Sequence, residues 1–457
     1  MPEIGRLFAA TDAIGDPGDL LTLACAVPDA PVVYWEHPAR GRALLGLGVA
    51  REIRASGAER FATVSAAAQR VLATVETIDG DRSGLCVLGG FAFSERRERD
   101  TPWSVFPPAR LVLPRVLWLR EGARWRRTEI WDEGDRSACE ALLARVSRRR
   151  PEPGRDLALY AAALSADERE SWRMRVDRAR ALIADGAVRK VVLARRRRLW
   201  AAADVDPAQI LAPARDARPT CFSFWVRPRH GASLIASSPE LLVRRSGMDV
   251  VASALAGSAP RAADPVEDRR HAAALLACPK NAREHSIVVA AVRDALASLA
   301  DDVGASAAPE LLRLPEAQHL ATSVRGRLRA AATVLEVGGV LHPTPAVCGT
   351  PRAAAQALIE REEPDRGWYT GAVGWMNEAG DGELAVALRS ALVAGREVTL
   401  WAGAGIVDGS DPDAELAETE AKMGALVAPF LGRPLRARTT CAVRPPGAEL
   451  AAEDGTR

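Results

Sequence analysis

Strand-like segments follow one another in runs, and this order limits the folds available to the chain. The first run comprises CFSFWV, SLIASS, LLVRR and DVVASALAG, between residues 221 and 257. The second comprises GWYTGAVGWM, GELAVALRSALVA and EVTLWAGAGIV, between residues 367 and 407. A doubly wound parallel sheet needs strands and helices to alternate, whereas consecutive strands favour antiparallel pairing. The sequence therefore predicts an α+β fold.

Helical patterns lie between and after these runs. Residues 166–188 repeat apolar side chains at helical spacing, which predicts an amphipathic helix, and the basic strand-like segment 188–200 follows it. Further helices are expected at about 266–300 and 353–360. A last helix is expected to end at about Leu431.

Three regions are predicted along the chain. Residues 1–155 carry the strand-like segments PVVYWEH, GLCVLGGFAF and the run from Leu111 to Leu119. They end in the basic cluster Arg148–Arg150, which is more typical of a solvated helix end than of a phosphate-binding patch. Residues 156–433 hold the candidate site. Residues 434–457 are rich in proline and arginine and are expected to form a mobile tail.

Charge and cysteine content exclude several classes of protein. The chain of 457 residues has 61 basic and 59 acidic side chains, a balance that gives no reason to expect a nucleic-acid partner. Its seven cysteines are scattered without a C-x-x-C pair, which favours a reducing cytoplasm. No apolar run reaches the ~18 residues of a membrane span. A cytoplasmic monomer without a membrane or nucleic-acid partner is therefore expected.

The segment from Trp401 to Lys422 carries the densest chemistry in the sequence. A turn with Gly403 and Gly405 leads into an acidic helix. On that helix Glu415, Glu418 and Lys422 are three and four residues apart, so they share one face. Carboxylates and an ammonium beside exposed backbone donors suit a divalent cation together with an anionic ligand.

Several other residues are candidates, and each has an ordinary structural alternative. Lys190 begins an apolar strand, where it is either a base in a cleft or a surface lysine. Glu240 follows a proline at a strand end, as a buried acid or an exposed turn residue. Gly257 and Ser258 form a small-residue turn that could approach a ligand or be an ordinary tight turn. Glu284 lies at the polar-to-apolar border of a helix, as a metal ligand or a satisfied core carboxylate.

One further pair suits an anionic ligand. Tyr369 and Arg389 could bind a carboxylate together, since a guanidinium offers a bidentate fork. Familiar catalytic motifs are missing from the sequence: it contains no P-loop, no G-x-S-x-G elbow and no H-E-x-x-H. Only half of a dinucleotide fingerprint is present, at Gly403-Ala404-Gly405.

Taken in order, these segments resemble the chorismate-utilising enzymes, which include isochorismate synthases, salicylate synthases and the large subunits of anthranilate and aminodeoxychorismate synthases. The resemblance covers about residues 165–430. It is carried by SSPELL, LAGS-x-PR, Glu284-His285, HPTPAV-x-G, GW-x-x-GAVGW, AGAGIV and ELAET-x-x-K. The fold that it implies has large antiparallel β layers with helices packed outside. The ligand that it implies is chorismate, which has two carboxylates.

The resemblance also implies roles in binding. Mg²⁺ would be held by Glu284 and Glu418 with support from Glu415, since hard oxygen ligands are what this ion prefers. Tyr369 and Arg389 would hold the enolpyruvyl carboxylate. The remaining anion pocket would be formed by Gly257, Ser258, Gly403, Gly405 and Lys422.

Roles in catalysis follow from the same resemblance. Lys190 would act as the general base that activates water for attack on ring carbon 2. Glu240 would protonate the hydroxyl that leaves ring carbon 4, which requires the carboxyl group to stay protonated. His319 stands where the family has an imidazole near that glutamate.

Two residues favour an isochorismate synthase within this family. Lys190 indicates water as the nucleophile, because members that use ammonia normally lack this lysine. Ala346 stands where members that also eliminate pyruvate normally carry threonine. The alternatives are a salicylate synthase and a non-catalytic chorismate-binding protein. The chain departs from the family pattern at Asn281, where an acid is usual, and at Ala254, where proline is usual.

Overall fold

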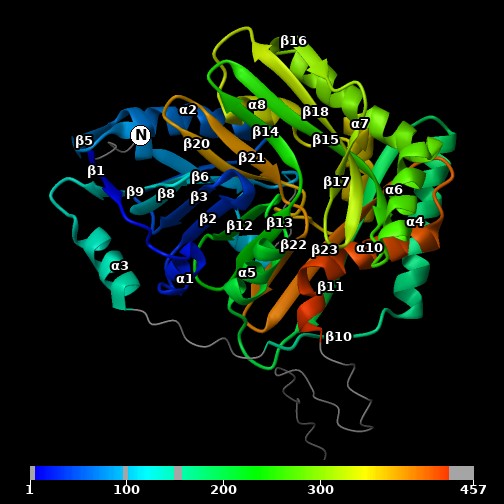
Figure 1. Cartoon of the computed structure of the whole chain (residues 1–457), viewed down its shortest axis with the longest axis horizontal. Coiled ribbons are helices and arrows are strands. Elements are labelled where there is room, and N and C mark those ends of the chain that lie inside the picture. Colours follow the sequence, from blue (N-terminus) through cyan, green and yellow to red (C-terminus); the bar gives the residue numbers. More distant parts are fainter. Residues whose placement is uncertain (1–5, 96–100, 149–156, 432–457) are drawn as a thin grey trace, which may run out of the picture.

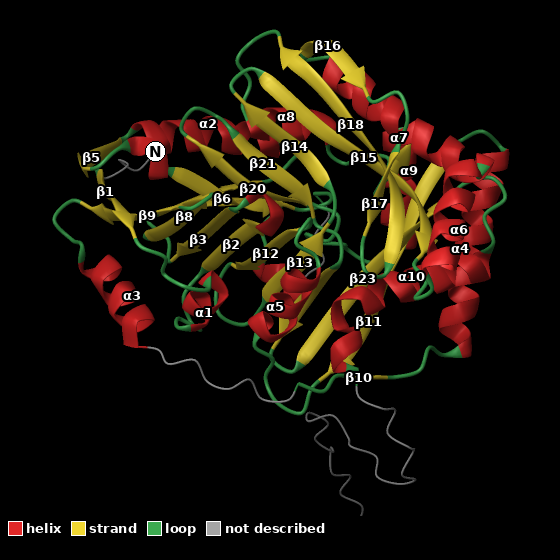
Figure 2. Ribbon diagram, viewed as in Figure 1, coloured by secondary structure: helices red, strands yellow, loops and turns green. Residues whose placement is uncertain are grey.

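The computed structural model describes residues 6–95, 101–148 and 157–431, which form two large β-sheets covered by helices (Figures 1 and 2). Apart from the parallel pair β1–β5, the strands of both sheets pair antiparallel. The α+β prediction with antiparallel layers and outer helices is thus confirmed. The proposed tail at 434–457 and Arg149–Arg150 lie outside the described residues. No helix within the described ranges is long and apolar enough to cross a bilayer.

The larger sheet combines strands from both ends of the chain. In spatial order it contains β10 (Tyr160–Ala161), β11 (Lys190–Trp200), β23 (Glu397–Ile406), β22 (Ser390–Ala394), β13 (Ser233–Ser238), β12 (Phe222–Arg227), β2 (Val32–His37), β3 (Arg42–Leu47), β8 (Val116–Glu121), β9 (Arg124–Asp132), β1 (Leu7–Ile14) and β5 (Val75–Asp79), with β19 (Gly349–Thr350) on β11.

The smaller sheet is built in the same way. In spatial order it contains β16 (Ala300–Ala305), β18 (Ala317–Leu328), β15 (Asp249–Pro260), β14 (Leu241–Ser246), β21 (Gly382–Val386), β20 (Ala372–Asn377), β6 (Cys86–Phe91), β7 (Ala109–Leu113) and β4 (Arg51–Ala55), with β17 (Glu310–Arg313) on β18.

Helices cover the outer faces of the two sheets. The α-helices are α1 (Leu20–Cys25), α2 (Arg60–Ala73), α3 (Ser137–Arg148), α4 (Ala166–Ala184), α5 (Pro207–Ala217), α6 (Pro265–Ala277), α7 (Pro279–Ala297), α8 (Val334–Leu341), α9 (Arg352–Glu362) and α10 (Pro412–Val427), and short 3₁₀ turns occur at Pro38–Arg40, Arg82–Gly84, Pro102–Val105 and Ala428–Phe430. Helices α2, α7 and α8 pack on the smaller sheet. Helices α1, α5 and α10 pack on the larger one.

A third apolar cluster fills the space between the sheets. It joins Trp35 and Phe224 of the larger sheet to Leu88 and Trp375 of the smaller one. Removing apolar surface from water stabilises a folded protein by about 25 cal/mol per Å². This buried layer therefore stabilises the folded chain. The layer fixes the two sheets against each other at the place where the site forms.

Three predicted segments are divided in the structure. The run from Leu111 to Leu119 becomes β7 and β8, in different sheets, because Pro114 interrupts it. The helix expected at 266–300 is α6 followed by α7, since Pro279 has no N–H with which to continue α6 and instead opens the next helix. The segment 382–394 becomes β21 and β22, also in different sheets. The Gly367–Gly371 part of the expected strand 367–376 is a turn that precedes β20.

Candidate active site

The candidate site lies where the chain twice crosses from one sheet to the other. Pro239 and Glu240 connect β13 to β14, and the turn ending at Arg389 connects β21 to β22. The crossings are hydrogen-bonded to each other, from Val386 N to the Glu240 carbonyl (3.0 Å) and from Ser237 N to the Arg389 carbonyl (3.1 Å). Backbone pairing therefore holds the side chains of both crossings at one pocket.

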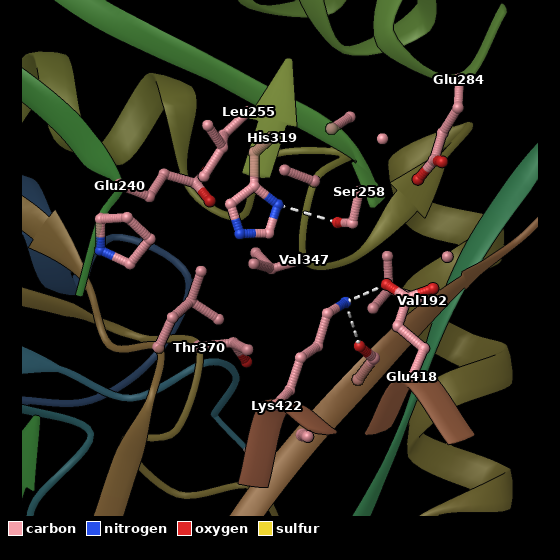
Figure 3. Close-up of a pocket in the computed structure, with 18 of the residues that line it drawn as sticks. Val192, Glu240, Leu255, Ser258, Glu284, His319, Val347, Thr370, Glu418 and Lys422 are labelled. Atoms are coloured by element: carbon pink, nitrogen blue, oxygen red, sulfur yellow. Dashed lines mark hydrogen bonds and ion pairs between the residues drawn. The ribbon is translucent and has the colours of Figure 1, made fainter. Parts of the chain in front are cut away.

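Other elements complete the walls of this pocket (Figure 3). The smaller sheet contributes β15 and β18, the larger sheet contributes β23, and helices α7 and α10 supply charged side chains. All predicted site residues except Lys190 line it: Glu240, Gly257, Ser258, Glu284, His319, Ala346, Tyr369, Arg389, Gly403, Gly405, Glu415, Glu418 and Lys422. Residues between Glu240 and Lys422 in the sequence thus meet in one cavity.

Lys190 lies directly behind the wall. Its side chain is 1% exposed, and its ammonium nitrogen is 2.8 Å from Oε1 of Glu284, which does line the pocket. Gly405 makes this contact possible: a Cβ there would stand 2.4 Å from the same Oε1 and 3.2 Å from Cε of Lys190. The amine is therefore one contact away from the pocket, and Glu284 joins the two.

Glu240 enters the pocket as an uncharged acid at neutral pH. Burial raises the pKa of its carboxyl to about 8, although the ammonium groups of Lys190 and Lys422 act in the opposite direction. Its Oε1 is buried without a hydrogen-bond partner among the described residues. A buried, unpaired and protonated carboxyl is suited to donating a proton.

His319 connects two other groups of the pocket. Nη2 of Arg389 lies 3.2 Å from Nε2 of His319. Oγ of Ser258 lies 2.8 Å from Nδ1 of the same ring (Figure 3). Burial, with Arg389 and Lys422 nearby, holds the pKa of His319 well below its usual range, so the ring is neutral. A guanidinium can only donate, so Nε2 accepts, and Nδ1–H then donates to Ser258. These contacts favour a role in orienting Arg389 and Ser258.

Backbone strain is concentrated at this site. Thr370 has φ +60° and Arg389 has φ +48°, a left-handed conformation that non-glycine residues rarely adopt. Both residues line the pocket. Gly257 also has positive φ (+78°), at a β-bulge of β15, where a Cβ would stand 3.3 Å from Cβ of Asn281 on α7. Strained residues of this kind cluster at ligand sites.

Helix α10 presents two carboxylates with different electrostatics. Asp411 caps the start of this helix, because its side chain accepts a hydrogen bond from Ala414 N at 2.8 Å. Burial and then repulsion from Glu418 raise the pKa of Glu415. Burial also acts to raise the pKa of Glu418, but Lys422, 2.5 Å away, outweighs it and leaves that pKa below the ordinary value. Lys422 also donates to the Gly403 carbonyl at 2.9 Å, which ties α10 to β23.

Several contributing residues were missed in the sequence. The buried ion pair Glu363–Arg366 (2.7 Å) connects the pocket walls, because Arg366 donates to the carbonyls of Val192 (2.7 Å) and Val347 (2.9 Å). The Trp401 ring stacks on the Tyr369 ring, with the two ring centroids 6.1 Å apart. No local pattern marks these residues. Their partners are distant in sequence, and a short motif cannot reveal such contacts.

The pocket carboxylates are suitable ligands for a divalent cation. Glu284, Glu415 and Glu418 offer hard oxygen atoms in one cavity. Within the part of the chain that the structure describes, no three His, Cys, Asp or Glu side chains form a ready-made cage. An ion that uses one or two carboxylates with water and substrate oxygens does not need such a cage, and this is the usual arrangement for Mg²⁺.

Comparison with known proteins identifies the family. Residues 6–430 match the family described as chorismate binding enzyme. The chain is 36% identical to the salicylate biosynthesis isochorismate synthase of Pseudomonas aeruginosa, over 92% of this chain and 89% of that protein. It is 31% identical to an isochorismate synthase of Bacillus subtilis, over 87% of this chain and 88% of that protein. The menaquinone-specific isochorismate synthase of Escherichia coli superposes with a TM-score of 0.79 at 26% identity, covering 93% of this chain and 95% of the other. This protein therefore belongs to the chorismate-binding enzyme family.

Proposed function

We propose that this protein is an isochorismate synthase, an isomerase that converts chorismate to isochorismate. The observation that carries the proposal is the pairing of a protonated acid with a buried amine at one pocket. Glu240 enters the cavity uncharged, and Lys190 lies behind Glu284 at its wall. The isochorismate synthases among its relatives support the same activity.

The reaction adds water at ring carbon 2 and releases the hydroxyl of ring carbon 4 as water, while the ring double bonds shift. Once its own ammonium has lost a proton, the neutral amine of Lys190 takes a proton from the attacking water. Glu240 gives its proton to the departing hydroxyl, so the protons balance over the two groups. Tyr369 and Arg389 hold the enolpyruvyl carboxylate. His319 keeps Arg389 and Ser258 oriented toward the ligand.

We infer that Mg²⁺ is the cation, with Glu284 and Glu418 as ligands and Glu415 in support. When bound, it supplies a positive centre that holds the ring carboxylate and draws electron density toward it. Gly403 and Gly405 leave room for the substrate beside β23, and Lys422 completes the anion site with Gly257 and Ser258. Two observations support Mg²⁺ as the cation: the glutamate oxygens at the pocket, and the ammonium groups paired with them.

Incubation of the purified protein with chorismate and Mg²⁺ tests this function. We expect isochorismate as the product by chromatography and no turnover after EDTA is added. Release of pyruvate by the wild-type protein would instead indicate a salicylate synthase. Binding of chorismate without any product would indicate a non-catalytic protein, and chorismate left unbound and unchanged would refute all three assignments.

Ala346→Thr is expected to make the enzyme release some pyruvate. Ala346 lines the pocket, and threonine adds a hydroxyl at the position where pyruvate-eliminating members normally carry one. Ala346→Val is the matched control, since valine has the same shape without the hydroxyl. A coupled lactate dehydrogenase assay measures the pyruvate. If the threonine variant yields no more than the valine variant, Ala346 does not separate the two activities.

A further inference from the structure

Lysine is rare in this chain and is confined to the candidate site. The sequence has 61 basic residues, of which only Lys190, Lys280 and Lys422 are lysines. Each ammonium is paired with a different pocket glutamate. The three pairs are Lys190 with Glu284 at 2.8 Å, Lys280 with Glu415 at 3.1 Å, and Lys422 with Glu418 at 2.5 Å.

The chemistry of the two basic side chains explains why these positions would keep lysine. A guanidinium grips both oxygens of a carboxylate in a fixed fork. An ammonium is a compact charge that bonds one oxygen and leaves the other for a second partner. All of the other 58 basic residues are arginines. The use of lysine at these three carboxylates therefore indicates that the carboxylates are shared with another cation.

Lys280 is the one lysine to which neither the resemblance nor the proposed mechanism gives a role. It lies in the first turn of α7 and reaches across to α10. Its side chain is 42% exposed, whereas that of Glu415 is 5% exposed. It therefore stands at the mouth of the pocket, with its charged end on a carboxylate inside.

We propose that Lys280 is a positioning residue that holds Glu415 at the metal site and yields one of its oxygens when the divalent cation binds. This inference rests on the proposed function, because it assumes a cation at these carboxylates. The ammonium thus has two opposed effects. It weakens binding of the cation by repulsion and by competition for Glu415, and it strengthens binding of the dianionic substrate.

Two substitutions of Lys280 are expected to change the affinity for Mg²⁺ in opposite directions. Lys280→Met removes the charge and is expected to tighten Mg²⁺ binding by about tenfold, since one unit charge a few ångströms from a divalent ion has at least this effect even in a water-like dielectric. The same variant is expected to raise KM for chorismate. Lys280→Arg keeps the charge but grips Glu415 with a fork, so Mg²⁺ binding is expected to weaken by a few fold.

Isothermal titration calorimetry of the full-length protein with Mg²⁺ alone measures the affinities of the wild type and of both variants. Arg283→Gln is the matched control: it removes a unit charge from the same helix, from a residue that does not line the pocket, and is expected to change the affinity by less than about twofold. If the methionine and arginine variants shift the affinity in the same direction, or if neither differs from wild type, Lys280 has no such role.

A second measurement does not depend on any variant folding well. Selective ¹³C-lysine labelling gives one Cε signal for each of the three lysines. We expect the Lys280 signal of the wild-type protein to shift as Mg²⁺ is added, and an unchanged signal contradicts the proposal. If wild-type protein neither binds Mg²⁺ nor forms isochorismate, the proposed function itself fails. If it does both and the predicted order is absent, only this inference fails.

Discussion

Lys190→Ala is expected to lower kcat for isochorismate formation by about 10²–10⁴-fold, the usual contribution of a general base. The side chain is buried at the start of β11, and its amine lies 2.8 Å from Oε1 of Glu284 in the pocket wall. Alanine cannot take the proton from water. It also leaves Glu284 without its ion pair, so a second variant is needed to separate the two consequences.

Lys190→Arg provides that separation. Arginine retains a positive charge for Glu284, but a guanidinium does not give up its proton near neutral pH. If Lys190 is the base, the arginine variant is as inactive as the alanine variant. If only the ion pair matters, arginine restores much of the activity. Added ethylamine is expected to restore part of the activity of Lys190→Ala alone, by supplying the missing amine. Turnover close to wild type in the alanine variant excludes this role.

The sequence was most informative where the site depends on local spacing. The intervals between Glu415, Glu418 and Lys422 predicted one helix face, and all three side chains of α10 line the same pocket. Order along the chain was also sufficient to predict antiparallel layers. Helix periodicity and strand succession are properties of a segment, so these features did not require knowledge of distant contacts.

The parts that could not be predicted depend on packing between distant segments. Lys280 meets Glu415 across 135 positions, only because α7 and α10 both contribute to the walls of the pocket. The left-handed backbone at Arg389 is imposed by a crossing between the two sheets, which is also why the segment around it divides into β21 and β22. Lys190 was expected in the pocket, but its place behind Glu284 depends on a strand register that no motif encodes.

Glu240→Gln is expected to reduce kcat by a similar factor, about 10²–10⁴-fold. Glutamine has nearly the same shape and stays uncharged, but it has no proton to give to the leaving hydroxyl. The wild-type enzyme should show the matching pH dependence. Because burial raises the pKa of Glu240 to about 8, kcat/KM is expected to fall as pH rises above about 8, with the loss of one proton. Retained turnover in the glutamine variant would exclude Glu240 as the acid.

Stability provides the control for this variant, and its sign follows from the same pKa. Between the ordinary value of 4.5 and about 8, the folded protein holds a proton on Glu240 that the unfolded chain releases, so this carboxyl makes unfolding easier as pH rises through that range. Above pH 8 the folded protein carries a buried charge that glutamine avoids. Glu240→Gln is therefore expected to unfold at a higher temperature than wild type at pH 9, with a gain of a few kcal/mol at most. An inactive variant that is also less stable at pH 9 would trace the loss to damaged packing, whereas an inactive and more stable one isolates the missing proton.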